Sequence, residues 1–151
     1  MHRHLVTAFT VLAVLGLAGS ALAHCQIPCG IYDDELRVKL IEEHITTIEK
    51  SIQEITTLSG ATPVNFNQLV RWVMNKEDHA NQLQELVTEY FMAQRIKAPA
   101  AAEGAEHAAY LTRLTLLHDM LVTAMKAKQT TDLANVEKLR QLVGKFRLAY
   151  F

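Results

Sequence analysis

The chain has 151 residues, of which half are hydrophobic, and its 15 basic and 16 acidic residues leave a formal net charge of −1. This length predicts one domain, and the hydrophobic content is sufficient for a buried core. The near balance of charge gives no basis for binding nucleic acid or a strongly charged surface. After residue 23, no segment is apolar over a length that could span a membrane.

Residues 1–23 have the features of a secretory signal peptide. Arg3 supplies a positive start, residues 5–18 form an uncharged and mostly apolar run, and residues 20–23 offer small side chains at a cleavage site. The run is short for a bilayer span and ends in small residues, so a retained anchor is the weaker interpretation. We therefore expect cleavage after Ala23 and an exported protein, periplasmic or secreted, with no stable membrane anchor.

Four amphipathic helices are expected after the leader. Breaks rich in Gly, Pro, Ser and Thr separate the segments, and Asp33 or Asp34 can cap the first of them. Short connections between such helices predict an all-α fold, an antiparallel four-helix bundle over residues 33–151. The expected helices cover residues 33–58, about 65 or 67 to 96, about 106–128, and 133 to the C-terminus.

Each helix has an apolar stripe that predicts which side chains are buried. In the first helix, isoleucines recur at intervals of four and three, as in a bundle seam. The predicted core residues are, in helix order, Ile41, Ile45, Ile48, Ile52 and Ile55; Leu69, Trp72 or Val73, Leu83, Leu86, Val87 and Tyr90; Tyr110, Leu114, Leu117, Leu121 and Met125; and Leu133, Val136, Leu139, Leu142, Val143 and Phe146.

Both cysteines of the chain, Cys25 and Cys29, follow the expected cleavage site and lie close to His24. Cleavage frees the α-amine of His24, which joins the backbone nitrogen of Cys25 and the two thiolates as a donor. A planar set of nitrogen and sulfur donors, with the His24 imidazole at an axial position, favours nickel or copper over the tetrahedral preference of zinc. Thiolates also donate electron density, which helps the metal reach a higher oxidation state.

The residues around the second cysteine suit a compact loop. Pro28 fixes its own φ, and Gly30 allows a sharp turn of the backbone directly after Cys29. Tyr32 then lies close enough to stand over an open axial position of the metal.

Residues 24–32 read HCQIPCGIY and match the H-C-x-x-P-C-x-x-Y hook of nickel-dependent superoxide dismutases. The chain resembles this family beyond the hook as well, because Tyr90-Phe91 is similar to a Tyr-Phe pair late in the family's second helix. The resemblance implies a homohexamer of four-helix bundles with one nickel ion per chain. It also implies disproportionation of superoxide to dioxygen and hydrogen peroxide, with nickel alternating between Ni(II) and Ni(III).

The resemblance further implies a role for each hook residue. His24 gives its amine and, in the oxidised state, its imidazole, while Cys25 gives its amide nitrogen and its thiolate. Cys29 gives the second thiolate, so the expected metal ligands are His24, Cys25 and Cys29. Tyr32 acts as a gate that excludes larger anions, and His24 and Tyr32 are the expected catalytic residues.

The chain departs from the family pattern near the hook. A lysine that follows the Tyr-Phe pair in the family is replaced by Met92, and Arg95 and Lys97 are candidates to attract an anion in its place. The glutamate that orients the histidine ring has no aligned counterpart, and Glu42 and Glu43 are the candidates.

Two other interpretations of the cysteine pair are considered. A disulfide between Cys25 and Cys29 is the usual fate of close thiols outside the cytosol, but it does not account for the accompanying His24, Pro28 and Tyr32. An exported protein that binds or delivers nickel or copper without turnover uses the same ligands, so it remains an alternative. Tyr32 favours the enzyme, because a carrier has no evident need for a gate.

Four further histidines lie on or beside the expected helices. A single histidine on a helix is more often a surface or hydrogen-bonded residue than a ligand, so we expect no direct role for any of them. A di-iron bundle needs Glu-x-x-His pairs on facing helices, and this chain has none. The four residues are His44, His79, His107 and His118.

Overall fold

The computed structural model describes residues 28–151, which contain helices and no strand. The elements in chain order are α2 (Asp34–Ser59), α3 (Phe66–Glu85), the π-helix η1 (Leu86–Arg95), α4 (Ala105–Gln129) and α5 (Ala134–Tyr150). The predicted all-α bundle is therefore confirmed. The leader predicted at residues 1–23 and the first part of the hook lie outside the described residues.

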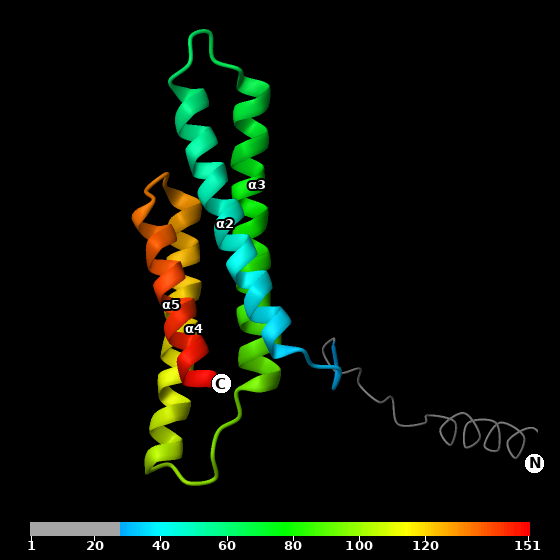
Figure 1. The fold of residues 1–151 in the computed structure, drawn as a ribbon, viewed down its shortest axis with the longest axis vertical. Coiled ribbons are helices and arrows are strands. Elements are labelled where there is room, and N and C mark those ends of the chain that lie inside the picture. The colour runs from blue at the N-terminus through cyan, green and yellow to red at the C-terminus, as the bar shows by residue number, and fades with distance from the viewer. Residues whose placement is uncertain (1–27) are drawn as a thin grey trace, which may run out of the picture.

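The helices run alternately up and down along one long axis (Figure 1). Each of the neighbouring pairs α2 with α3, α3 with α4, α4 with α5, and α5 with α2 is in contact, as expected for an antiparallel bundle. The two hairpins are staggered, because the α2–α3 connection extends beyond the α4–α5 connection (Figure 1). Within the described residues, no helix is apolar over a length sufficient to cross a membrane.

Polar side chains start the first two helices. The carboxylate of Asp33 accepts a hydrogen bond from the backbone N–H of Leu36 at 2.9 Å, and the amide oxygen of Asn65 accepts one from the N–H of Gln68 at 3.2 Å. Each satisfies one of the backbone donors that a helix start leaves without an intrahelical partner. The first helix thus begins at one of the two predicted cap positions.

The predicted isoleucine seam is confirmed. All five isoleucines of the pattern, from Ile41 to Ile55, are buried, and the first four belong to one core cluster with Leu83 of α3 and Val87 of η1. In α5 the predicted core is also buried, except for Leu133, which precedes the helix and is exposed. Val73 in α3 is likewise exposed.

The predicted register of α4 is wrong at its C-terminal end. Met125 was expected in the core but is 44% exposed, and the buried side chains there belong to Thr123, Ala124 and Ala127. Small side chains at the contact let neighbouring helices approach closely, so the helix turns its alanines inward and places the larger Met125 at the flank. A pattern that scores only hydrophobicity selects the larger residue.

The register of α4 can be tested by a pair of leucine substitutions. Ala124→Leu adds three carbons at a fully buried position and is expected to destabilise the bundle by about 1–3 kcal/mol through overpacking. Met125→Leu conserves volume at an exposed position and is expected to change the free energy of unfolding by less than about 0.5 kcal/mol. Urea denaturation followed by circular dichroism measures both, and the reverse order would support the register predicted from sequence.

Candidate metal centre

The described part of the hook is a tight turn that carries Cys29. The backbone N–H of Ile31 donates to the carbonyl of Pro28 at 3.1 Å, and the two residues between them have positive φ, 42° at Cys29 and 92° at Gly30. A side chain at Gly30 would meet no atom within 4 Å, so the backbone conformation and not space requires glycine there. Cys29 itself is exposed, so its thiol can reach a metal outside the bundle.

Tyr32 is held against the bundle by two side chains of η1. The guanidinium of Arg95 lies 4.3 Å from the centre of the Tyr32 ring, and Tyr90 meets that ring edge-on with 5.9 Å between ring centres. Cation–π and edge-to-face contacts of this kind fix the orientation of a ring. Tyr32 stays 40% exposed, so the ring is positioned but still faces solvent.

The carboxylate of Asp34, at the first residue of α2, connects this end of the molecule. Arg95 donates to it from Nε at 2.8 Å and from Nη2 at 2.7 Å. The hydroxyls of Tyr90 and Tyr150 donate to it at 2.6 and 2.8 Å. One half-buried carboxylate thus joins α2, η1 and α5 through charge-assisted hydrogen bonds.

The ionisation of these groups follows from their contacts. Burial alone would raise the pKa of Asp34, but hydrogen bonds from Arg95, Tyr90 and Tyr150 outweigh it and lower the pKa below the ordinary value of 3.8. Burial and the hydrogen bond to Asp34 raise the pKa of Tyr90 to about 12. For Tyr150 the same two causes also raise the pKa. At neutral pH the network is therefore one carboxylate, one guanidinium and two neutral phenols.

The π-helical register explains why two residues of η1 reach the same carboxylate. Residues five apart in an α-helix differ by about 140° around the axis, since each residue turns the helix by about 100°. The wider turn of η1, seen in the hydrogen bond from the N–H of Ile96 to the carbonyl of Phe91 at 2.9 Å, brings Tyr90 and Arg95 to one side. Such segments are frequent at functional sites. The apolar pattern does not distinguish them from an α-helix.

A cleft of about 360 Å³ lies beside the turn, bordered by Pro28, α2 and the second helix. Arg37 lines it with its guanidinium 5.1 Å from the centre of the Tyr90 ring. The Nε of Arg37 is buried and has no hydrogen-bond partner among the described residues. The acidic side chains of Glu85 and Glu89 line the same cleft, so its charge is mixed.

The predicted site residues fall into three groups. His24 and Cys25 lie outside the described residues. Cys29 and Tyr32 lie at the end of the bundle where Arg95 is found. The remaining candidates are Glu42, Glu43 and Lys97, which are exposed and do not line the cleft. Met92, at the position of the family's lysine, is half-buried.

The donors available at this end suit nickel. Cys29 offers a soft sulfur ligand on an exposed turn, and the sequence places a second cysteine and a histidine within five residues before it. Within residues 28–151 no group of three or more His, Cys, Asp or Glu side chains could hold a metal ion. The described part of the chain therefore contributes Cys29 alone to the predicted set.

A family model for nickel-containing superoxide dismutases matches residues 19–151, a region that includes the whole predicted hook. The chain belongs to this family. No curated protein and no solved structure gives a significant match. A nickel-containing superoxide dismutase is an oxidoreductase that acts on superoxide, so family membership favours the enzyme over the carrier that the donor set alone left open.

The role of the Asp34 network can be tested through the pH dependence of stability. The pKa of Asp34 in the folded state lies below the ordinary value of 3.8. The stabilisation that the Asp34 carboxylate provides is therefore fully present above pH 3.8 and is lost as the pH falls through the folded-state pKa. Asp34→Asn is expected to cost about 2–3 kcal/mol at pH 7. The difference from wild type should shrink as the pH falls toward 2, and urea denaturation at several pH values measures it.

Asp33→Asn is the matched control for this experiment. It removes one negative charge at the neighbouring residue, and asparagine serves as well as aspartate at a helix N-cap. We expect it to stay within about 0.5 kcal/mol of wild type at pH 7. Equal effects of the two substitutions would show that the charge, and not the network, stabilises this end.

Proposed function

We propose that residues 24–32 of this superoxide dismutase form a hook that binds one nickel ion per chain at the processed N-terminus. The observation that carries the proposal is the juxtaposition of the Cys29 turn with Tyr32, whose ring is held by Arg95 and Tyr90. A redox metal held by Cys29 lies next to a positioned phenol and close to a cation. Residues 33–151 then serve as the rigid base for the hook.

In this proposal, the ligands come from three residues of the hook. His24 provides its free amine and its imidazole, Cys25 its backbone nitrogen and thiolate, and Cys29 its thiolate. The positive φ at Cys29 and Gly30 reverses the chain between Pro28 and Ile31, at the second cysteine, which supports a compact hook beside Tyr32.

Bound nickel supplies a one-electron couple, Ni(II)/Ni(III), through which two superoxide ions and two protons become dioxygen and hydrogen peroxide. Tyr32 restricts the approach to small anions because its ring is fixed on one side by Arg95. Arg95 takes the place of the family's lysine, whose position holds Met92 here, with a positive charge that Asp34 largely balances, so that its main role is to position Tyr32. Asp34 holds Arg95 by two short hydrogen bonds and thereby sets the position of both Arg95 and Tyr32.

The proposed ligand set requires that His24 be the first residue of the mature chain. Within a longer chain the nitrogen of His24 would be a second backbone amide, which must lose its proton before it can bind a metal. A free amine binds through its lone pair directly, so cleavage after Ala23 creates the site. Residues 1–23 are then a signal peptide, and the mature enzyme works outside the cytosol. There the thiols must be protected from oxidation until nickel is bound.

The proposed site can be tested on protein recovered from an exporting host. N-terminal mass analysis is expected to show His24 as the first residue, and metal analysis is expected to give one nickel per chain. Cys29→Ser is expected to remove both the nickel and the superoxide dismutase activity, because a hydroxyl is a far weaker ligand for nickel than a thiolate. A mature chain that starts before His24 and is fully active would contradict the proposal.

Ser51→Ala serves as a control for fold and export in the same experiment. Ser51 lies in the middle of α2, and its hydroxyl bonds only within the bundle, to the carbonyl of Thr47 and the amide of Asn75. We expect normal nickel content and activity from this variant. Loss of nickel in both variants would indicate a general folding defect and not a ligand role for Cys29.

We further propose that the bundles associate into a homohexamer and that the start of α3 takes part. Phe66, Val70 and Met74 recur at intervals of four and are 70%, 54% and 59% exposed. This apolar stripe lies where the α2–α3 hairpin extends beyond the other two helices (Figure 1). An exposed stripe of large apolar residues is typical of a contact between proteins.

The contribution of the stripe can be tested by adding a charge to it. Val70→Glu is expected to lower the mass in solution below that of the wild-type hexamer, because a carboxylate is costly to bury in an apolar contact. Asn67→Glu adds the same charge to an exposed position next to the stripe and should leave the mass unchanged. Light scattering after size-exclusion chromatography measures both, and a monomeric wild type would contradict the proposal.

A further inference from the structure

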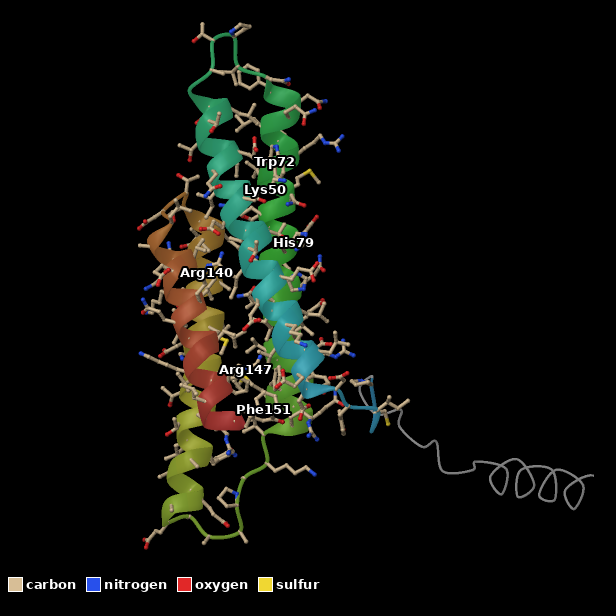
Figure 2. All side chains as sticks on the ribbon, in the orientation of Figure 1. Lys50, Trp72, His79, Arg140, Arg147 and Phe151 are labelled. Atoms are coloured by element: carbon tan, nitrogen blue, oxygen red, sulfur yellow. The ribbon has the colours of Figure 1, made fainter. Side chains whose placement is uncertain are left out.

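Two histidines that are 35 residues apart in the sequence meet between α2 and α3. The Nδ1 atoms of His44 and His79 lie 2.9 Å apart, and the ring centres lie 5.1 Å apart with 57° between the planes. Both side chains are half-buried. Figure 2 shows His79 near the middle of the α2–α3 pair, well away from the ends of the bundle.

A short Nδ1–Nδ1 separation has two chemical explanations. In the first, the two neutral rings share a proton, with one ring protonated on Nδ1 and the other on Nε2. In the second, both Nδ1 atoms present lone pairs to one metal ion. Metal–nitrogen bonds of about 2.0–2.1 Å place two ligands at a right angle about 2.9 Å apart, and two tetrahedral ligands about 3.3 Å apart. The observed distance therefore requires little movement to receive an ion.

The surroundings of the pair suit a cation that keeps some water. His44 lines the cleft beside the hook turn together with Gln82, which lies one helical turn after His79 and can offer an amide oxygen. Acidic residues are close, because Glu43 precedes His44 and the carboxylates of Glu85 and Glu89 line the same cleft. Burial and the neighbouring His79 lower the pKa of His44, so its imidazole is neutral, which is the ligating form, at pH 7.

We propose that His44 and His79 together bind a divalent transition-metal ion of the copper, nickel or zinc class, at a site separate from the hook. Imidazole nitrogen is a preferred ligand for these three metals. Only two protein nitrogens converge, so water and the amide oxygen of Gln82 complete the coordination. Such a site exchanges its ion more readily than a closed structural site with four protein ligands. The proposal does not depend on the hook being the catalytic centre.

The test uses the mature enzyme loaded with nickel and dialysed until one nickel per chain remains, so that the hook is occupied and the more readily exchanging histidine site is empty before the second metal is added. Isothermal titration with Zn²⁺ is expected to show one equivalent bound per chain, while metal analysis shows that the nickel content stays constant. Zinc should also raise the Tm, because an ion that binds two helices at once stabilises the folded state. A wild-type enzyme that binds no zinc beyond its nickel would overturn the proposal.

Single variants identify the ligands. His44→Gln and His79→Gln each remove one imidazole, and each is expected to weaken zinc binding by at least about tenfold and to abolish the rise in Tm. His118→Gln removes an exposed histidine from α4 and should bind zinc as wild type does. Far-UV circular dichroism checks that each variant is folded. Unchanged zinc binding in both pair variants would leave the shared proton as the explanation of the short distance.

Discussion

The carboxylate of Asp34 is the contact on which the arrangement of the end of the bundle beside the Cys29 turn depends. It begins α2, and it accepts hydrogen bonds from η1 through Tyr90 and Arg95 and from α5 through Tyr150. Three elements that are distant in sequence are thereby tied at one half-buried point. The hydrogen bonds keep the carboxylate charged despite its burial, so the negative charge that holds Arg95 in place is maintained at physiological pH.

The Asp34 contact lies between two regions of different character, the Cys29 turn and the helical bundle. In the proposed function the hook closes around a metal, and its described turn has the left-handed backbone that only a few residues adopt without strain. The bundle under this turn is joined to it through packed aromatic rings. Edge-to-face ring contacts run from Tyr32 through Tyr90 and Phe91 to Phe146 and connect the turn with the core without a break. Tyr32, the proposed gate, is therefore anchored to the packed core of the bundle.

The continuous helical segment formed by α3 and η1 contributes to three features of the molecule along its length. Its start presents an apolar stripe to solvent, its middle brings His79 to His44, and its π-helical end aims Tyr90 and Arg95 at Asp34. The change from α-helical to π-helical geometry between α3 and η1 lets Tyr90 and Arg95 both reach Asp34. A continuous α-helix would place Tyr90 and Arg95 on different sides, and one of them would miss the carboxylate.

The sequence by itself determined the fold class, the four helical segments, the isoleucine seam and the hook motif. These features depend on local periodicity, on capping and break residues, and on ligand types that stand next to one another, all of which can be recognised along one chain. The tertiary structure alone decided the register of α4, the π-helical turn, the Asp34 network and the meeting of His44 with His79. Each depends on side chains from different helices arriving at one place. A single histidine or aspartate carries no record of its distant partner, because that partner is chosen by how the helices pack.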